Sequence, residues 1–296
     1  MHGLPKKRTS SGQTLLVVVL VISVSLIVVM SVVARTLTDV KITGKEEESL
    51  RAFSAAEAGV EKALIAGSQS LTALDNNASF TADVLSIFQG TDQFVSPLTY
   101  LSGESATVWF VNHDASGNLV CDGTYPCYTG TGIFVCWKNA PLPAFEVSIY
   151  YTAASDPWNL TTLKIARAAY DPDSVRATSN HFTYSAPASC TITAEVFPNQ
   201  RLIDFSTLGI ADVDSAIPGV LKFAKIRFLY NTANPVKFGI KRQDPLLTAI
   251  FPSQGLLVSS SGTSGEANRK VNVYQAYAEA PQIWEAALFS ANAIIK

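Results

Sequence analysis

Four cysteines are the residues of this 296-residue chain with the clearest capacity for covalent chemistry. They permit three disulfide pairings. The segment between the first two is short and rich in turn-forming residues, which favours the pairs Cys121–Cys127 and Cys136–Cys190. A zinc site would also use thiolates, but the spacing lacks the usual C-x2–4-C pairs and nearby histidines. Free buried thiols are the third alternative.

Other chemistry-bearing residues are sparse. No histidine has a partner four residues away for a metal, and the chain has no G-x-S-x-G, phosphate-binding loop or G-x-G-x-x-G. Two acidic pairs fall on predicted loops, where solvated acids are expected; calcium would need more oxygen ligands in register. We therefore expect no enzyme activity, metal or cofactor. The residues concerned are His2, His113 and His181, and the pairs Asp171/Asp173 and Asp212/Asp214.

One long apolar run dominates the chain. No charged residue occurs between Arg8 and Arg35, and residues 14–34 are almost entirely apolar. About 20 such residues span a bilayer as a helix. Lys6, Lys7 and Arg8 precede the run, so the N-terminus is expected to be cytoplasmic and the remainder exported. A buried core helix and signal-peptidase cleavage near residue 34 are the alternatives.

The helix is predicted to continue beyond the membrane. No proline occurs between residues 5 and 97, and alanine is frequent from 52 to 63. We predict one helix over about 14–66, ending near Gly67, or two helices with a break near Gly44. An apolar stripe with helical period predicts the packing face, which consists of Leu50, Phe53, Ala56, Val60 and Leu64.

Two segments resemble a known family. The basic leader, residues 11–16 (SGQTLL) and the apolar run resemble the class III signal of type IV pilins and type II secretion pseudopilins. Residues 52–61 (AFSAAEAGVE) resemble the matching segment of PilX-type minor pilins and K-type minor pseudopilins. Residues 250–290 are similar to the end of such proteins. Val17 stands where major pilins carry a glutamate, which favours a minor, initiating or tip subunit.

The resemblance implies a processing route and a set of partners. A prepilin peptidase would cleave after Gly12 and methylate the new N-terminal Gln13. The helix would then leave the cytoplasmic membrane through an inner-membrane assembly platform, driven by an assembly ATPase. Other pilins and minor pilins would pack against it in a type IV pilus or a related secretion filament, and the product would lie on the cell surface.

The implied fold class is α+β and pilin-like, with a long N-terminal transmembrane helix and a β-rich exported domain. The expected parts are a leader over 1–12, a membrane segment over 13–35, an amphipathic continuation over 36–66, and the β-rich region over 67–296. Short helices are expected near 80–89, 160–170 and 282–290. Strands are expected at 107–111, 119–121, 133–137, 146–151, 190–196, 225–230, 255–260 and 269–274, the last two joined by a Ser/Gly loop.

Composition separates the candidate functions. Without the three basic leader residues, 19 basic residues face 24 acidic ones, a net charge of −5 that makes nucleic-acid binding an unfavoured alternative. A secreted hydrolase lacks a nucleophile–base pattern. The leading interpretation is a non-enzymatic minor pilin, and the alternative is a membrane-anchored binding module or adhesin. Residues weighed for ligand binding are Trp109, Trp137 and Trp158, and for a basic patch Lys222, Lys225, Arg227, Lys237, Lys241 and Arg242.

Overall fold

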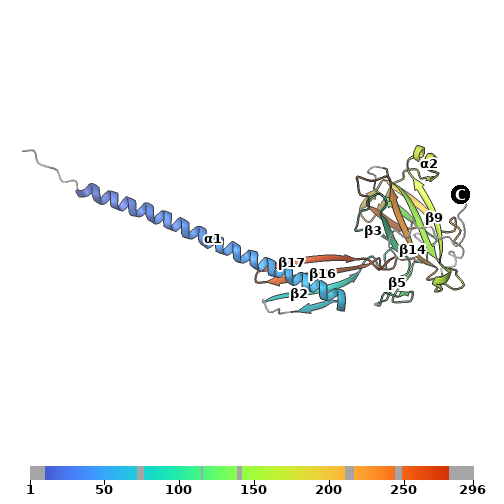
Figure 1. The fold of residues 1–296 in the computed structure, drawn as a ribbon, viewed down its shortest axis with the longest axis horizontal. Helices are drawn as coiled ribbons and strands as arrows, with labels where there is room; N and C mark the ends of the chain where they lie inside the picture. The colour runs from blue at the N-terminus through green and yellow to red at the C-terminus, as the bar shows by residue number, and fades with distance from the viewer. Residues whose placement is uncertain are drawn as a thin grey trace, which may run out of the picture. The chain divides into compact units, whose positions relative to one another are not determined.

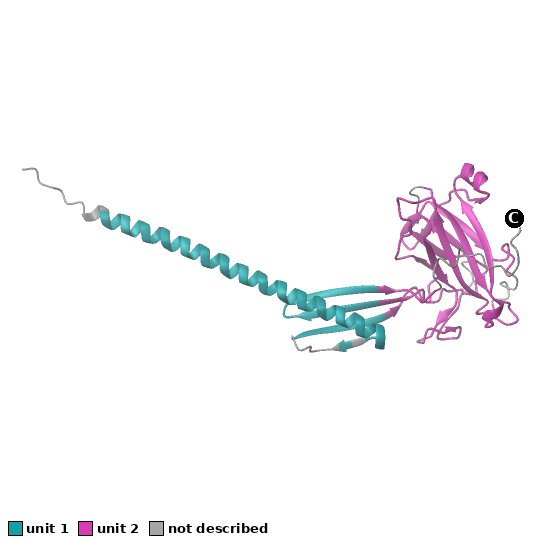
Figure 2. Ribbon diagram, viewed as in Figure 1, with its two compact units in different colours: residues 1–84, 258–273 teal, residues 85–257, 274–296 magenta. Residues whose placement is uncertain are grey.

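The computed structural model describes residues 11–71, 77–114, 116–138, 142–210, 217–243 and 249–279. The chain forms two compact units (Figure 2). Unit 1 contains residues 1–84 and 258–273, and unit 2 contains 85–257 and 274–296. The β-rich region expected over 67–296 is therefore divided, because its first and last strands belong to the same unit as the helix.

Helix α1 runs from Ser11 to Ala66 without a break at Gly44. It is one helix because proline is absent and alanine favours the conformation throughout its second half. At about 1.5 Å per residue it is roughly 84 Å long. Gly67 ends it, as expected, with a φ of +77° and an amide that donates to the Ala63 carbonyl at 2.9 Å.

The second half of α1 packs on a four-stranded sheet with the order β1-β2-β16-β17 (Figure 1). Strand β1 pairs antiparallel with β2, while β16 and β17 are joined by a two-residue turn containing Gly265. The Ser/Gly stretch expected as a loop is the second half of β16, since its small side chains alternate against the helix. The strands are β1 (Gln69–Leu71), β2 (Ala78–Ser86), β16 (Leu256–Ser264) and β17 (Ala267–Gln275).

The buried face of α1 differs from the predicted stripe. Ala56 and Val60 are buried, but Leu50, Phe53 and Leu64 are 68%, 44% and 43% exposed. The sheet packs against the alanine face because small side chains let the two backbones come closer together than leucine or phenylalanine would. The residues buried on this face are Ala52, Ala55, Ala56, Val60 and Ala63, which lie against a core that includes Phe80 and Val258.

Unit 2 is a β-sandwich. A five-stranded sheet, ordered β10-β9-β8-β14-β4, faces a four-stranded sheet, ordered β13-β7-β15-β3. Side chains from both sheets, among them Phe145, Phe228, Trp137 and Phe238, form one core. The strands are β3 (Gln93–Val95), β4 (Ser105–Trp109), β7 (Gly132–Trp137), β8 (Ala144–Tyr151), β9 (Lys164–Asp171), β10 (Thr183–Tyr184), β13 (Asn199–Asp204), β14 (Leu221–Leu229) and β15 (Phe238–Arg242).

Smaller elements complete unit 2. The predicted hairpin around residues 114–118 is present, although the strands that pair are β5 and β6 rather than β4. The prediction of a helix at 80–89 is wrong. Most of this segment belongs to strand β2, in which buried and exposed side chains alternate. In place of the helix predicted at 160–170, the structure has a single helical turn followed by β9. The helix predicted at 282–290 lies outside the described residues. The elements are β5 (Asn112–His113), β6 (Leu119–Val120), η1 (Leu160–Thr162), α2 (Ser174–Asn180), β11 (Cys190–Ile192) and β12 (Glu195–Phe197).

The disulfide prediction is confirmed. Cys121 pairs with Cys127 and Cys136 with Cys190, at Cα–Cα distances of 5.4 and 6.0 Å, and no cysteine is free. The zinc and free-thiol alternatives are thereby removed. The second bond links β11 to β7 and is buried beside Ile192 and Phe197. Such bonds in the globular part fit an exported protein.

Candidate functional site

The apolar half of α1 is an extended uncovered apolar surface. Every large apolar side chain from Leu15 to Ile42 is 48% to 68% exposed. By length and composition α1 is able to cross a membrane, and the apolar window is covered by nothing else in the described chain. Such a surface is stable only in lipid or against other helices, because water would face hundreds of square ångströms of hydrocarbon.

Four hydroxyls within this half donate to backbone carbonyls of the helix itself. The Ser23 hydroxyl donates to the Leu20 carbonyl at 2.9 Å, and the Ser25 hydroxyl donates to the Val21 carbonyl at 2.8 Å. Thr36 and Thr38 donate to carbonyls four residues earlier in the same way. These hydroxyls therefore enter an apolar environment without an unpaired donor.

The predicted processing residues lie at the start of this helix. Gly12 and Gln13 are within the first turn of α1, and their side chains are outside the described part of the structure. The leader residues before Ser11 are likewise not described. The fifth position after the predicted cleavage point, Val17, is 53% exposed on the helix surface.

In unit 1, helix α1 and strand β16 approach each other closely at two glycine residues, Gly262 and Gly59. A Cβ on Gly262 would overlap the carbonyl oxygen of Ala52 and lie 2.5 Å from the Ala56 amide nitrogen, both backbone atoms of α1. A Cβ on Gly59 would meet side chains instead, the Ser260 hydroxyl and the Phe80 ring. The helix therefore rests on β16 at backbone distance, which fixes its position on the sheet.

A polar rim and a shallow groove border this contact. Arg269 on β17 donates to the Ser49 hydroxyl at 2.6 and 2.8 Å, and the Glu266 amide donates to Glu48 at 3.3 Å. The groove beside them has a volume of about 510 Å³ and is open to solvent. It is lined by Ile42, Lys45, Glu46, Ser49, Leu50 and Arg269.

The acidic pairs do not form a calcium site in the described residues. Asp171 accepts hydrogen bonds from Arg176, Asn180 and the Asp173 amide, and Asp173 caps α2 by accepting from two backbone amides. Burial raises the pKa of Asp171, but these donors outweigh it and hold the pKa below its ordinary value. Asp212 and Asp214 lie outside the described residues, and no metal-ligating cluster occurs within the rest.

The tryptophans, and the basic residues that were weighed as a patch, are dispersed. Trp109 and Trp137 are buried, which is the core-packing role that tryptophan takes by default. Trp158 is half exposed, with its ring 4.6 Å from the buried Lys222 ammonium, whose pKa burial lowers to about 8. The patch does not form, because β14 and β15 lie in different sheets; Lys237, Arg242 and Lys225 pair with Glu195, Asp92 and Glu279 respectively.

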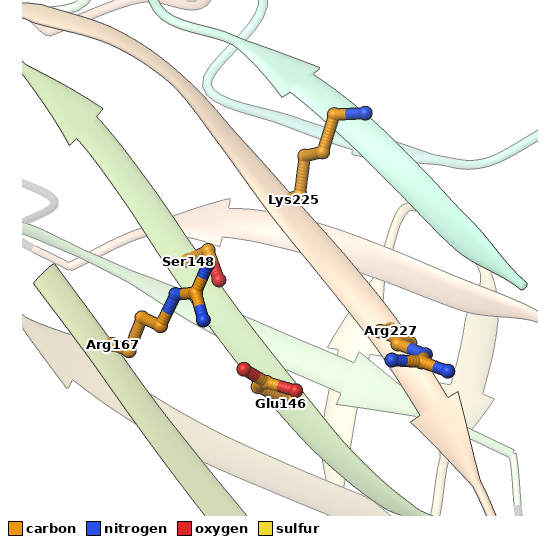
Figure 3. A pocket seen from close by; sticks show the side chains of 5 residues that line it. All are labelled: Glu146, Ser148, Arg167, Lys225 and Arg227. Carbon is orange, nitrogen blue, oxygen red and sulfur yellow. The ribbon is translucent and has the colours of Figure 1, made fainter. Parts of the chain in front are cut away.

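A charged row, of which the sequence analysis singled out only Lys225 and Arg227, lies on the outer face of the five-stranded sheet (Figure 3). Alternate residues of β8, β9 and β14 pack into the core, so their neighbours point outward. Ser148 lies between Arg167 and Lys225 in register, and Glu146 lies opposite Arg227. These five residues line a concavity of about 20 Å³, which is room for one water. The alternation of polar residues in the three strands was the available signal.

An aromatic pocket adjoins this row at the β4 edge of the same sheet. Its volume is about 120 Å³. Tyr274, Tyr277 and Glu279 from the segment after β17 form one side, and Thr107 from β4 forms another. The further lining residues are Leu98, Tyr100, Ser105, Ala106, Trp109, Gln254 and Ala276.

His113 packs against two of the aromatic residues that line this pocket, Trp109 and Tyr277. Its ring stacks on Tyr277 at 3.8 Å and meets Trp109 edge-on at 4.5 Å, and its Nδ1 has no hydrogen-bond partner among the described residues. Burial lowers the pKa of His113 to about 4, although Asp114 opposes the shift. The imidazole is therefore neutral at pH 7.

We expect this histidine to make the protein less stable in acid. The pKa is about 4 folded and 6.5 unfolded, so the unfolded chain binds more protons and the unfolding free energy falls as pH drops through that window, by up to about 3 kcal/mol. Denaturant unfolding of the full chain in detergent at pH 7.0 and 4.5 measures it. The His113→Phe variant keeps the ring stacking, and its unfolding free energy should fall less between these two pH values. An equal fall in both proteins would exclude His113 as the cause.

Comparison of this chain with protein-family models, curated proteins and solved structures gives no match.

Proposed function

We propose that this chain is a non-enzymatic minor subunit of a type IV pilus or a related secretion filament. In this proposal it enters the cytoplasmic membrane through α1, with its N-terminus in the cytoplasm. A prepilin peptidase removes residues 1–12 and methylates Gln13. An inner-membrane assembly platform then moves the helix from lipid into a bundle with other pilins, and the β-rich part reaches the cell surface.

The observation that carries the proposal is the division of α1 into two surfaces. Residues 15–42 leave every large apolar side chain uncovered, while the alanine face from Ala52 to Ala63 is buried on the chain's own sheet. One helix thus serves as a membrane segment and as the spine of a folded unit. A subunit that exchanges lipid for neighbouring helices needs such a rigid continuous element, because a break at the membrane surface would uncouple the two halves.

The architecture of unit 1 also supports the proposal. Strands β1 and β2 follow the helix directly, whereas β16 and β17 return from the far end of the described chain to complete the same sheet. The β-sandwich of unit 2 is therefore an insertion between β2 and β16. An insertion of this kind adds surface to a subunit without interrupting the helix–sheet core that assembly would use.

The mature N-terminus is the direct test. Coexpression of the full chain with a prepilin peptidase, followed by intact and peptide mass spectrometry, should yield a chain that begins at N-methylated Gln13. Gly12→Val should abolish cleavage, because the peptidase must accommodate the residue before the cut. Gly3→Val, which changes another leader glycine, is the matched control and should be processed normally.

A second candidate function predicts the opposite result. A membrane-anchored binding module would keep its leader, and the charged row and aromatic pocket of unit 2 favour a ligand-binding role. An intact N-terminus in the presence of active peptidase would reject the filament subunit and leave the anchored module. A chain beginning just after Ala34 would reject both, since a secreted protein has no membrane helix.

A further inference from the structure

We propose that the outer face of the five-stranded sheet in unit 2 binds an acidic saccharide, a sugar chain that carries carboxylates. The site consists of the charged row (Glu146, Ser148, Arg167, Lys225 and Arg227) and the aromatic pocket beside it. This inference concerns unit 2 alone and does not depend on assembly of the chain into a filament.

The first argument is that two guanidinium groups on this face have unused donors. Arg167 makes no ion pair or hydrogen bond among the described residues, and Arg227 donates only to the Gly103 carbonyl, at 3.2 Å. Glu146 lies opposite Arg227 in register but forms no ion pair with it. Arginine binds carboxylates through two parallel hydrogen bonds, so these side chains are suited to a carboxylate from outside.

The second argument is that the same row already holds a carboxylate. Glu279, in the segment after β17, accepts a hydrogen bond from the Thr107 hydroxyl, and its carboxylate lies 3.7 Å from the Lys225 ammonium. The Lys225 side chain is 4% exposed and that of Glu279 is 34% exposed, so the pair is only partly shielded from water. A carboxylate is therefore the group that the row accommodates within the chain itself, beside Lys225, which lies two residues before Arg227 on β14.

The third argument is the aromatic surface next to the charges. Phe223 lies opposite both Tyr150 and Trp109, and its ring is 4.3 Å from that of Tyr150 and 5.1 Å from that of Trp109. Tyr150 and Phe223 are partly exposed. The C–H faces of a pyranose ring pack on aromatic side chains, while its hydroxyls bind mixed donors and acceptors such as Ser148 and Glu146. The combination suits a sugar better than a simple anion.

Charge balance favours a saccharide over nucleic acid. Two carboxylates, Glu146 and Glu279, lie among the three cations. The chain without its leader carries a net charge of −5. A duplex with one charge every ~1.7 Å would be repelled by these acids and by the overall field. A sugar acid with one carboxylate per ring places its charges on the arginines and its hydroxyls near the acids.

The test is calorimetric titration of the full chain in detergent. The probe is tetragalacturonate, and the comparison ligands are a neutral galactose tetramer and a 12-base-pair DNA duplex. We expect saturable binding of the acidic tetramer, weakening as salt rises, and affinity at least about ten-fold lower for the neutral tetramer, which lacks the charge-assisted hydrogen bonds.

Variants separate this site from surface charge in general. Arg167→Gln/Arg227→Gln should weaken tetragalacturonate binding about ten-fold or more. The melting temperature should change little, because Arg167 is exposed and the half-buried Arg227 gives up one 3.2 Å hydrogen bond. Lys164→Gln is the matched control: it removes a cation from β9 on the opposite face and should bind as the wild type does. Absence of saturable binding, equal affinity in the double variant, or tighter binding of the duplex would overturn the proposal.

Discussion

Gly262→Ala is expected to detach the second half of α1 from its sheet. The added Cβ meets the Ala52 carbonyl oxygen and the Ala56 amide nitrogen, which are backbone atoms and have no alternative rotamer. Overpacking against backbone costs about 3 kcal/mol, the upper end of the usual range. Hydrogen exchange of the full chain in detergent should show residues 48–66 exchanging about 100-fold faster, since local opening sets their protection.

Two other glycines provide controls on the same helix. A Cβ on Gly44 meets nothing within 4 Å, so Gly44→Ala should slow exchange through its helix propensity, worth about 1 kcal/mol. Gly59→Ala should have an intermediate effect, because the Ser260 hydroxyl and the Phe80 ring can move. Unchanged protection in Gly262→Ala, or the same change in all three variants, would contradict backbone contact between α1 and β16.

Loss of the disulfide between Cys136 and Cys190 is expected to destabilise unit 2 strongly. The bond closes a loop with a sequence separation of 54, and loop-closure entropy predicts about 4 kcal/mol for that length. Cys136→Ala/Cys190→Ala also leaves space beside Ile192 and Phe197. Guanidinium unfolding of the full chain, followed by tryptophan fluorescence, should show a clearly lower midpoint.

The other disulfide is the matched comparison. Cys121 and Cys127 are separated by six residues, for which the same relation predicts roughly 2 kcal/mol. Cys121→Ala/Cys127→Ala should therefore lower the unfolding free energy by about half as much. A larger loss from the short loop than from the long one would mean that chain entropy does not control the contribution of these bonds.

Much of the fold was readable because its signals are local. The apolar run, the absence of proline and the alanines predicted one long helix, and Gly67 predicted its end. Strand-like runs predicted β7 and β8 to within two residues at each end, and the second half of β14. The segment at 80–89 was misread as helix, because short mixed segments carry no clear period.

The candidate sites were harder to predict from the sequence, because they depend on residues far apart in the chain. The sequence could not indicate which face of α1 would be covered, since apolar size suggested Leu50 and Phe53 while close approach selected the alanines. It also could not bring Arg167, Glu146 and Arg227 together, because their alignment depends on the registers of β9, β8 and β14.

By itself, the sequence determined the membrane-length helix and the β-rich remainder, and it favoured the cysteine pairs that the structure has, because hydrophobic length, residue spacing and turn composition act over a few neighbouring residues. The tertiary structure decided the rest. It joined β16 and β17 to the sheet under α1, divided the β-rich region between two units, and placed a charged row beside an aromatic pocket. Strand order and register set these arrangements, and they arise from contacts between segments as much as 220 residues apart.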